Sequence, residues 1–207
     1  MDAPVLCARY DRFDIYFEGY GWDLPRTSKM MENLEESRYA DICGTDIEGM
    51  ADVGWQFIAE PVCFTAENKR GKVVAIAWAA PMRTEDKRTG CNLTYAVDEQ
   101  YEGRGLATLL TAIAFLAADR LHPQMRFANI ECRTDNKGSI AVAKSLGLAR
   151  HPEEDFSMPV SGKRKKVAFY CFRKKINQCR QSALRILQKK NMDELLGLIK
   201  KSAKQNS

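Results

Sequence analysis

The stretch CNLTYAVDEQYEGRGLATLLTAIAFLAADR (91–120) decides the fold. Its first part, CNLTYAV (91–97), is an apolar run typical of a strand, and LATLLTAIAFLAADR (106–120) is an apolar helix. A second strand, FANIEC (127–132), then leads into TDNKGSIAVAKSLGL (134–148), a helix with a cap at each end. The order strand, turn, helix, strand, helix predicts a βαβ-type unit.

The turn DEQYEGRG (98–105) carries the chemistry of this unit. Gly103 and Gly105 flank Arg104 at the point where the strand gives way to the helix. Glycines let the backbone adopt positive φ and let a ligand approach closely. The helix that follows offers unpaired N–H groups and the positive end of its dipole. We therefore expect a seat for a phosphate or pyrophosphate, with a plain tight turn as the alternative.

Two well-known glycine loops do not match this turn. A dinucleotide-binding fingerprint needs a third glycine three residues after Gly105, where the chain has Thr108. A Walker loop needs Gly-Lys followed by Ser or Thr, and that sequence does not occur. A Rossmann or P-loop nucleotide site is therefore not predicted.

What remains, QYEGRG (100–105), resembles the Gln/Arg-x-x-Gly-x-Gly/Ala loop of the GNAT superfamily, the acyl-CoA-dependent N-acyltransferases. The second helix strengthens the resemblance. In that family an Asn opens this helix, a small residue follows three positions later, and Gly with a hydrophobe closes it. The matching residues here are Asn136, Ser139, Gly147 and Leu148. The resemblance covers roughly residues 55–173.

The resemblance implies an α+β fold with a central twisted mixed sheet of six or seven strands flanked by helices on both faces. The fourth strand, 91–97, is expected to separate from its neighbour and leave a gap for acyl-CoA, with acetyl-CoA as donor. The residues implied for cofactor binding are the strand residues Tyr95, Ala96 and Val97, the turn and helix residues Gln100, Gly103, Arg104, Gly105, Leu106, Ala107 and Thr108, and Asn136 and Ser139 of the second helix.

The catalytic residues are less well defined by this resemblance. Many family members carry a Tyr seven residues after the Asn as the general acid, and this chain has Ala143 there. We consider Ser139, Tyr95 and Tyr170 as replacements, with departure of the thiolate without an acid as the alternative. The N–H of Val97 is our candidate donor to the developing oxyanion.

Strands are also expected in the N-terminal part and on both sides of the central unit, because these stretches alternate or are apolar and are separated by polar turns. The expected strands lie within 4–20 and at 55–66, 72–82, 149–158 and 166–172. A helix capped by Ser28 is expected over roughly 29–42, and 43–54 is expected to be a loop.

Charge divides the chain into an acidic body and a basic end. Residues 161–207 contain fourteen Lys or Arg and two Asp or Glu, a net of +12, whereas residues 1–160 have a net of −7. We expect an acyltransferase domain over 1–173 and a basic extension of two amphipathic helices over 174–207. The extension can pack on the domain, form a homodimer or contact an anionic polymer such as tRNA or DNA.

Seven cysteines without a Cys-x-x-Cys pair, together with the absence of a secretory leader or a bilayer-length apolar run, favour a reduced cytoplasmic protein away from the membrane. The two histidines have no neighbours at metal-ligand spacing, so no metal site is predicted.

Three functions follow from these observations. The first is transfer of an acetyl group from acetyl-CoA directly to a primary amine. The second is the same reaction on an amine carried by a nucleic acid, as in aminoacyl-tRNA or a modified DNA base. The third is a catalytically silent domain of the same fold that serves in binding.

Overall fold

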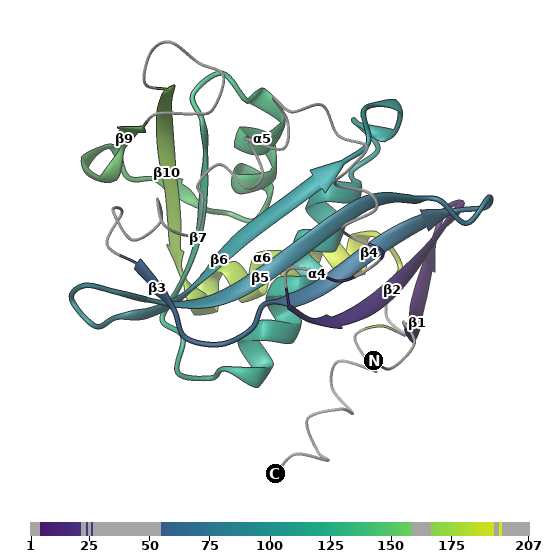
Figure 1. Ribbon diagram of the computed structural model, residues 1–207, viewed down its shortest axis with the longest axis horizontal. Helices are drawn as coiled ribbons and strands as arrows, with labels where there is room; N and C mark the ends of the chain where they lie inside the picture. The colour runs from purple at the N-terminus through teal and green to yellow at the C-terminus, as the bar shows by residue number, and fades with distance from the viewer. Residues whose placement is uncertain are drawn as a thin grey trace.

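The computed structural model describes residues 5–21, 55–158 and 167–192, together with Leu24, Arg26 and Leu195. They form a mixed β-sheet with helices packed against it (Figure 1). The strands are β1 (Val5–Tyr10), β2 (Phe13–Tyr20), β3 (Trp55–Phe57), β4 (Val62–Asn68), β5 (Val73–Thr84), β6 (Thr89–Val97), β7 (Phe127–Arg133), β8 (Ala149–Arg150), β9 (Phe156–Met158) and β10 (Val167–Lys175). The helices are α4 (Leu106–Leu121), α5 (Lys137–Ser145) and α6 (Ile176–Lys189), with the 3-10 turns η1 (Glu99–Tyr101) and η2 (Pro152–Glu154).

The strands follow the order β1-β2-β4-β5-β6-β7-β10-β8, with β3 paired to β5 and β9 to β10. Strands β6 and β7 are parallel, and the other described pairs are antiparallel. The parallel pair is joined through α4, as the predicted βαβ unit requires. The α+β fold with a mixed sheet flanked by helices is therefore confirmed.

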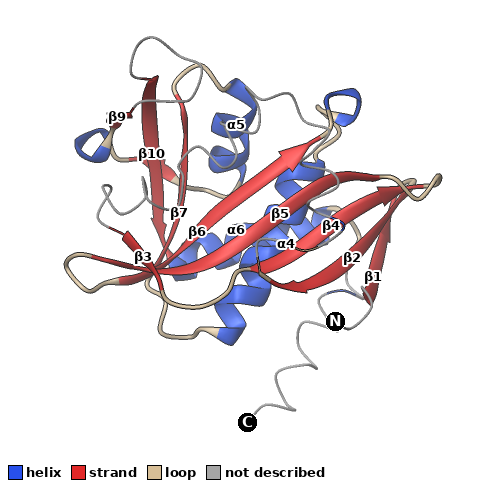
Figure 2. Cartoon of the chain, in the orientation of Figure 1, coloured by secondary structure: helices blue, strands red, loops and turns tan. Residues whose placement is uncertain are grey.

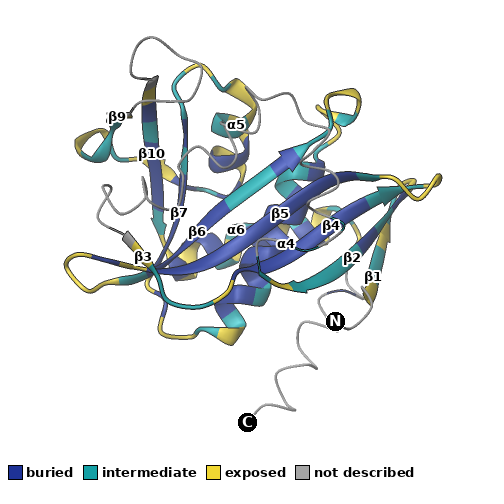
Figure 3. Cartoon of the chain, in the orientation of Figure 1, coloured by how far each residue is buried: buried dark blue, intermediate teal, exposed yellow. Residues whose placement is uncertain are grey.

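The main core lies between the sheet and the helices. Helix α4 packs across β4, β5 and β6, and α6 packs alongside α4 (Figure 2). The side chains of β5 alternate between the two faces of the sheet, and each face contacts a different apolar cluster. Ala75, Ala77 and Ala79 belong to the main core, whereas Ile76 and Trp78 belong to a smaller cluster on the opposite face. Small alanines let α4 lie close to the buried centre of the sheet, seen in Figure 3.

Strands β6 and β7 pair only at one end. Their register covers Gly90 with Phe127, Cys91 with Ala128 and Asn92 with Asn129, and no rung follows Asn129. Gly90 allows this close start, because a β-carbon there would lie 2.4 Å from the ring of Phe127. The expected separation of the strand at 91–97 from its neighbour is therefore present.

Most of the expected elements are found, with shifted ends. The stretch 55–66, which the sequence predicts as one strand, is divided into β3 and β4 by a break before Pro61. The stretch 149–158 likewise contains two short strands and a 3-10 turn. The predicted helix over 29–42, the loop over 43–54 and the basic turn over 161–166 lie outside the described residues.

The beginning of the basic extension is part of the main core. Ile176, Cys179, Ala183 and Leu187 of α6 are buried there, at the three- and four-residue spacing of one helix face. Arg180 donates to the carboxylate of Asp119 on α4 at 2.8 Å. Of the options open for residues 174–207, packing on the domain therefore holds for α6. The division at 173 and the homodimer stay predictions, and most of the second expected helix lies outside the described residues.

Within the part of the chain that the structure describes, we find no helix whose length and apolar character would let it cross a bilayer. The six cysteines described, which are Cys7, Cys63, Cys91, Cys132, Cys171 and Cys179, are free thiols.

The packing of α6 predicts a large cost for truncating Leu187, whose side chain is fully buried. Leu187→Ala should lower the free energy of unfolding by about 2–5 kcal/mol, because it removes apolar contacts and leaves a cavity. Urea denaturation measures this difference. The neighbouring Gln188 is exposed, so Gln188→Ala should change stability by no more than about 0.5 kcal/mol. Equal, small effects of the two changes would contradict the packing.

Candidate active site

The site is built around the gap between β6 and β7. Beyond Asn92 and Asn129 both strands continue, β6 to Val97 and β7 to Arg133, without pairing to each other. The N–H of Asp98 donates to Val74 on the β5 side at 2.9 Å. Because N–H directions alternate along a strand, the N–H of Val97 points to the other side of β6, towards the gap. This orientation suits the main-chain contacts with acyl-CoA that the family resemblance implies for this strand.

The glycine turn lies at the end of the gap. Gly103 has φ 70° and Gly105 has φ 76°, so both adopt the left-handed conformation that glycine favours. A β-carbon on Gly103 would have nothing within 4 Å, which shows that the turn is open at this residue. Gln100 and Arg104 are exposed, and the Arg104 guanidinium donates to the carbonyl of Gln100 at 3.3 Å.

Helix α4 begins without a side-chain cap. Gly105 is its N-cap residue, no capping side chain bonds to its first N–H groups among the described residues, and its first turn contains no acidic residue. Leu106 is buried, whereas Ala107 and Thr108 are half-buried. The first turn therefore keeps N–H donors and a positive dipole end that suit an anion such as pyrophosphate.

Helix α5 begins at the far side of the gap. The side-chain oxygen of Asn136 accepts a hydrogen bond from the N–H of Ser139 at 2.9 Å, which is an N-cap. No partner of the Asn136 side-chain NH₂ group is found among the described residues. Asn136 thus caps α5 with one atom and retains two donor hydrogens for a ligand.

Two of the three candidate catalytic residues come together. The hydroxyl of Tyr95 on β6 donates to the carbonyl of Ser139 on α5 at 3.3 Å, so these two residues connect the two sides of the gap. Burial raises the pKa of Tyr95 well above its ordinary value, and the hydrogen bond to Ser139 lowers it only in part. The phenol is therefore protonated at neutral pH.

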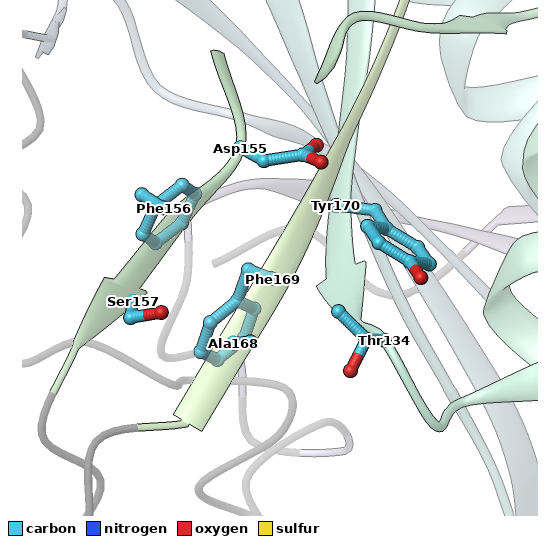
Figure 4. A pocket seen from close by; sticks show the side chains of 7 residues that line it. All are labelled: Thr134, Asp155, Phe156, Ser157, Ala168, Phe169 and Tyr170. Carbon is cyan, nitrogen blue, oxygen red and sulfur yellow. The ribbon is translucent and has the colours of Figure 1, made fainter. Parts of the chain in front are cut away.

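The third candidate, Tyr170, lies elsewhere. It is on β10, beyond β7, with the Arg150 guanidinium 3.9 Å from the centre of its ring. Tyr170 lines a pocket of about 260 Å³ beside β9 (Figure 4). The other residues that line this pocket are Thr134, Asp155, Phe156, Ser157, Ala168 and Phe169. Strand β7 thus lies between β6, which carries Tyr95, and β10, which carries Tyr170.

Asp98 has a structural role in the turn. Its carboxylate accepts from the N–H of Gln100 at 3.1 Å, which caps η1, and it pairs with Lys72 at 2.7 Å. Glu99 is exposed in the same turn. Asp98 and Glu99 are therefore residues of the turn.

The sequence interpretation missed Glu131. Ala128, Ile130 and Cys132 of β7 belong to the main core, so Asn129 and Glu131 point to the opposite face of the sheet. Burial raises the pKa of Glu131 to about 8. The signal for it was the one charged residue of the run FANIEC (127–132), two residues after the last rung to β6 at Asn129.

We find no group of three or more His, Cys, Asp or Glu side chains in the described ranges that could hold a metal ion.

Comparisons with known proteins agree with this geometry. A model of the acetyltransferase (GNAT) family matches residues 28–148, which is more than half of the chain. A comparison with curated proteins finds no match. Solved structures of similar fold include yncA, a putative acetyltransferase from Salmonella typhimurium with its cofactor acetyl-CoA, at 16% identity and a TM-score of 0.57 over 80% of this chain and 95% of that one. NAA60 from Arabidopsis thaliana in complex with a bisubstrate analogue has 16% identity and a TM-score of 0.52 over 78% and 97%.

An open gap in a mixed sheet, with a glycine turn at one end and a capped helix beside it, defines an acyl-CoA-dependent acetyltransferase fold. The chain belongs to the GNAT acetyltransferase family. The cofactor of this family is acetyl-CoA. The open turn at Gly103, the uncapped start of α4 and the available amide of Asn136 fit such a ligand.

The dual role of Asn136 can be tested with Asn136→Asp. Both residues cap a helix well, so the free energy of unfolding should change by less than about 0.5 kcal/mol. The carboxylate has no donor hydrogen at neutral pH, so CoA affinity should fall about tenfold or more, ~1.4 kcal/mol. Urea denaturation and titration calorimetry measure the two quantities. Asn136→Ala removes the cap and the donor together, so it should reduce both the free energy of unfolding and the CoA affinity. If CoA affinity is unchanged in Asn136→Asp, Asn136 serves only as a helix cap.

Proposed function

We propose that the protein transfers the acetyl group of acetyl-CoA directly to a primary amine. The observation that supports this most strongly is the gap between β6 and β7, which begins after Asn92 and Asn129 and is flanked by an anion seat and a capped helix. Each side of such a gap offers main-chain groups to an extended ligand in the manner of an added strand.

The residues of this chain divide the binding between them. Main-chain groups of β6 from Tyr95 to Val97 hold the extended arm of the cofactor, and the N–H groups from Gly103 to Thr108 hold its pyrophosphate. Asn136 and Ser139 orient the end that carries the acyl group. When bound, acetyl-CoA supplies an activated acyl group on a thiol that must leave.

Tyr95 is the general acid in this proposal. Its hydroxyl contacts the carbonyl of Ser139, and Ser139 is one helical turn before Ala143 on the same face of α5. A phenol from β6 thus reaches the helix face where many family members carry their own Tyr. Because burial raises its pKa, Tyr95 is protonated at neutral pH and therefore carries a proton that it can donate to the departing thiolate.

Tyr95→Phe tests the proposal. Loss of the hydroxyl should lower kcat about 10²-fold or more, while CoA affinity stays within twofold, because the main-chain contacts remain. The measurement is thiol release from acetyl-CoA with a panel of primary amines. Tyr170→Phe is the matched control and should retain wild-type turnover, since Tyr170 lines the pocket beside β9 and not the gap.

The same assay decides between an enzyme and a silent domain. A wild-type protein that binds CoA but releases no thiol with any amine would contradict the proposed transfer. Turnover in Tyr95→Phe equal to that of the wild type would remove Tyr95 from the mechanism and leave the transfer in place.

The basic surface formed by α5 and α6 favours an amine carried by a nucleic acid as a second candidate. Lys137, Lys144, Arg185 and Lys189 are exposed on these two helices, and neither helix contains an Asp or Glu. Ser182 of α6 lies 2.7 Å from the position that a β-carbon of Gly147, two residues after the end of α5, would occupy. Exposed cations without intervening carboxylates suit the phosphates of tRNA or DNA.

Charge reversal on α6 tests this candidate without disturbing the core. The double change Arg185→Glu and Lys189→Glu should weaken tRNA or DNA binding at ~50 mM salt and reduce the salt dependence of that binding, because fewer counterions are released. Filter binding across a salt series measures both. Lys69→Glu with Arg70→Glu, on the exposed turn between β4 and β5, is the matched control. Equal losses in the two variants would show only a general charge effect.

A further inference from the structure

Glu131 occupies the position where the sheet opens. The last rung between β6 and β7 joins Asn92 to Asn129, and Glu131 is the next residue of β7 on the same face. On its other side β7 stays paired, with Glu131 opposite Cys171 of β10. The carboxylate is therefore at the edge of the gap, on the face of the sheet opposite α4.

The neighbours of Glu131 on this face form a polar group. Arg173 of β10 holds Glu154 of η2 through both guanidinium nitrogens, at 2.5 and 2.6 Å. Asn129 accepts from Arg173 and from the Cys171 thiol, both at 3.3 Å. The side chain of Asn129 also hydrogen-bonds the carboxylate of Glu131.

The other charged and polar groups near Glu131 have partners of their own. Arg133, two residues further along β7 on the same face, pairs with Asp135 at 2.7 Å. Strand β6 contributes Asn92 and Thr94, which carry no charge. The charges that act on Glu131 from β10 and η2 are thus those of Arg173 and Glu154.

Four other carboxylates near this face, within the described ranges, pair with an arginine. Asp14 pairs with Arg9, Glu18 and Glu67 both pair with Arg26, and Glu154 pairs with Arg173. No ion pair of Glu131 is found among the described residues. A half-buried carboxylate at the edge of a ligand gap, without a cation of its own, is placed to accept a proton.

We infer that Glu131 is the general base that takes a proton from the acceptor amine, which reaches the gap from the face opposite α4. This inference rests on the proposed acetyl transfer. The amine nitrogen forms a bond to the acyl carbon as the bond from that carbon to sulfur breaks. One N–H proton of the neutral amine passes to Glu131, the other stays on the amide, and the sulfur takes a proton from Tyr95. Glu131 then releases its proton to solvent and Tyr95 takes one from solvent, so both residues return to their starting state.

The ionisation of Glu131 suits this role. Burial raises its pKa to about 8, while the hydrogen bond from Asn129 and the charge of Arg173 lower it, and the charge of Glu154 raises it. A base whose pKa is near the working pH is partly ionised and still strong enough to take the proton. An ordinary surface carboxylate is ionised but much weaker.

Glu131→Gln is the first test. It should lower kcat/KM about 10²-fold or more and leave the CoA affinity within twofold of the wild type, because the change is on the acceptor face. Glu85→Gln, an exposed carboxylate in the turn between β5 and β6, is the control and should keep wild-type activity. Full activity in Glu131→Gln overturns the inference, whereas a wild type without turnover overturns the proposed transfer.

The pH profile separates a base from a structural residue. With an acceptor amine that is itself neutral above pH 6, kcat/KM of the wild type should rise through a pKa of about 8. Glu154→Gln should move this rise to lower pH. It removes the negative charge that raises the pKa of Glu131 and leaves the positive charge of Arg173, which lowers that pKa. A rise that does not move overturns the inference. Glu154→Gln also decides the question if Glu131→Gln does not fold.

Stability gives a readout that needs no turnover. The pKa of Glu131 is raised from 4.5 to about 8 on folding, so the folded state binds the proton more tightly. Its favourable contribution is present below pH 4.5 and is lost as the pH rises through about 8. Glu131→Gln, which stays neutral, should therefore raise Tm relative to the wild type at pH 9 and not at pH 4. A lower Tm at pH 9 would instead indicate a structural carboxylate and overturn the inference.

Discussion

The separation of two neighbouring parallel strands is the constraint on which the site depends. Backbone N–H and C=O groups that are half-buried need partners, and a sheet normally supplies them from the next strand. Here β6 and β7 share rungs only up to Asn92 and Asn129, so the groups beyond these residues face a gap. The ring of Phe127 against Gly90 holds the strands together at one end, and the bond from Tyr95 to Ser139 holds β6 to α5 at the other. In the proposed function, the extended arm of acyl-CoA lies along this part of β6 in the manner of an added strand.

The two faces of this gap carry different chemistry because side chains alternate along each strand. Tyr95 on the helix face is protonated and contacts the first turn of α5, where a leaving thiolate needs a proton. Glu131 lies on the opposite face, where burial raises its pKa to about 8. In the proposed mechanism, the sheet thus separates the acid Tyr95 from the base Glu131, and burial raises the pKa of both side chains. The burial that makes Glu131 a stronger base also makes its ionised form costly to the fold, as is common at functional sites.

The elements of the central unit could be predicted because each has a local signal. The glycine turn, the apolar period of α4 and the cap at Asn136 are properties of short stretches. Glu131 could not be assigned in this way, since its environment depends on Glu154 of η2 and Arg173 of β10, which lie 23 and 42 residues further along the chain. Choosing between Tyr95 and Tyr170 likewise required the strand order, which places β7 between them. Charge alone suggested a docking role for the C-terminal residues, whereas the burial of Leu187 required the position of α4.

The packing of α6 changes the meaning of the basic end of the chain. A solvated tail would present its cations at no fixed position, and binding through it would be purely electrostatic. Instead the apolar face of α6 is buried and Arg180 is committed to Asp119, so Arg185 and Lys189 are held on a rigid helix. At the end of the same helix, Lys190 donates to the hydroxyl of Tyr10 and lies 3.4 Å from the position that a β-carbon of Gly105 would occupy. The C-terminal end of α6 therefore lies beside the glycine turn. A nucleic acid bound to Arg185 and Lys189 would lie at a defined distance from the gap.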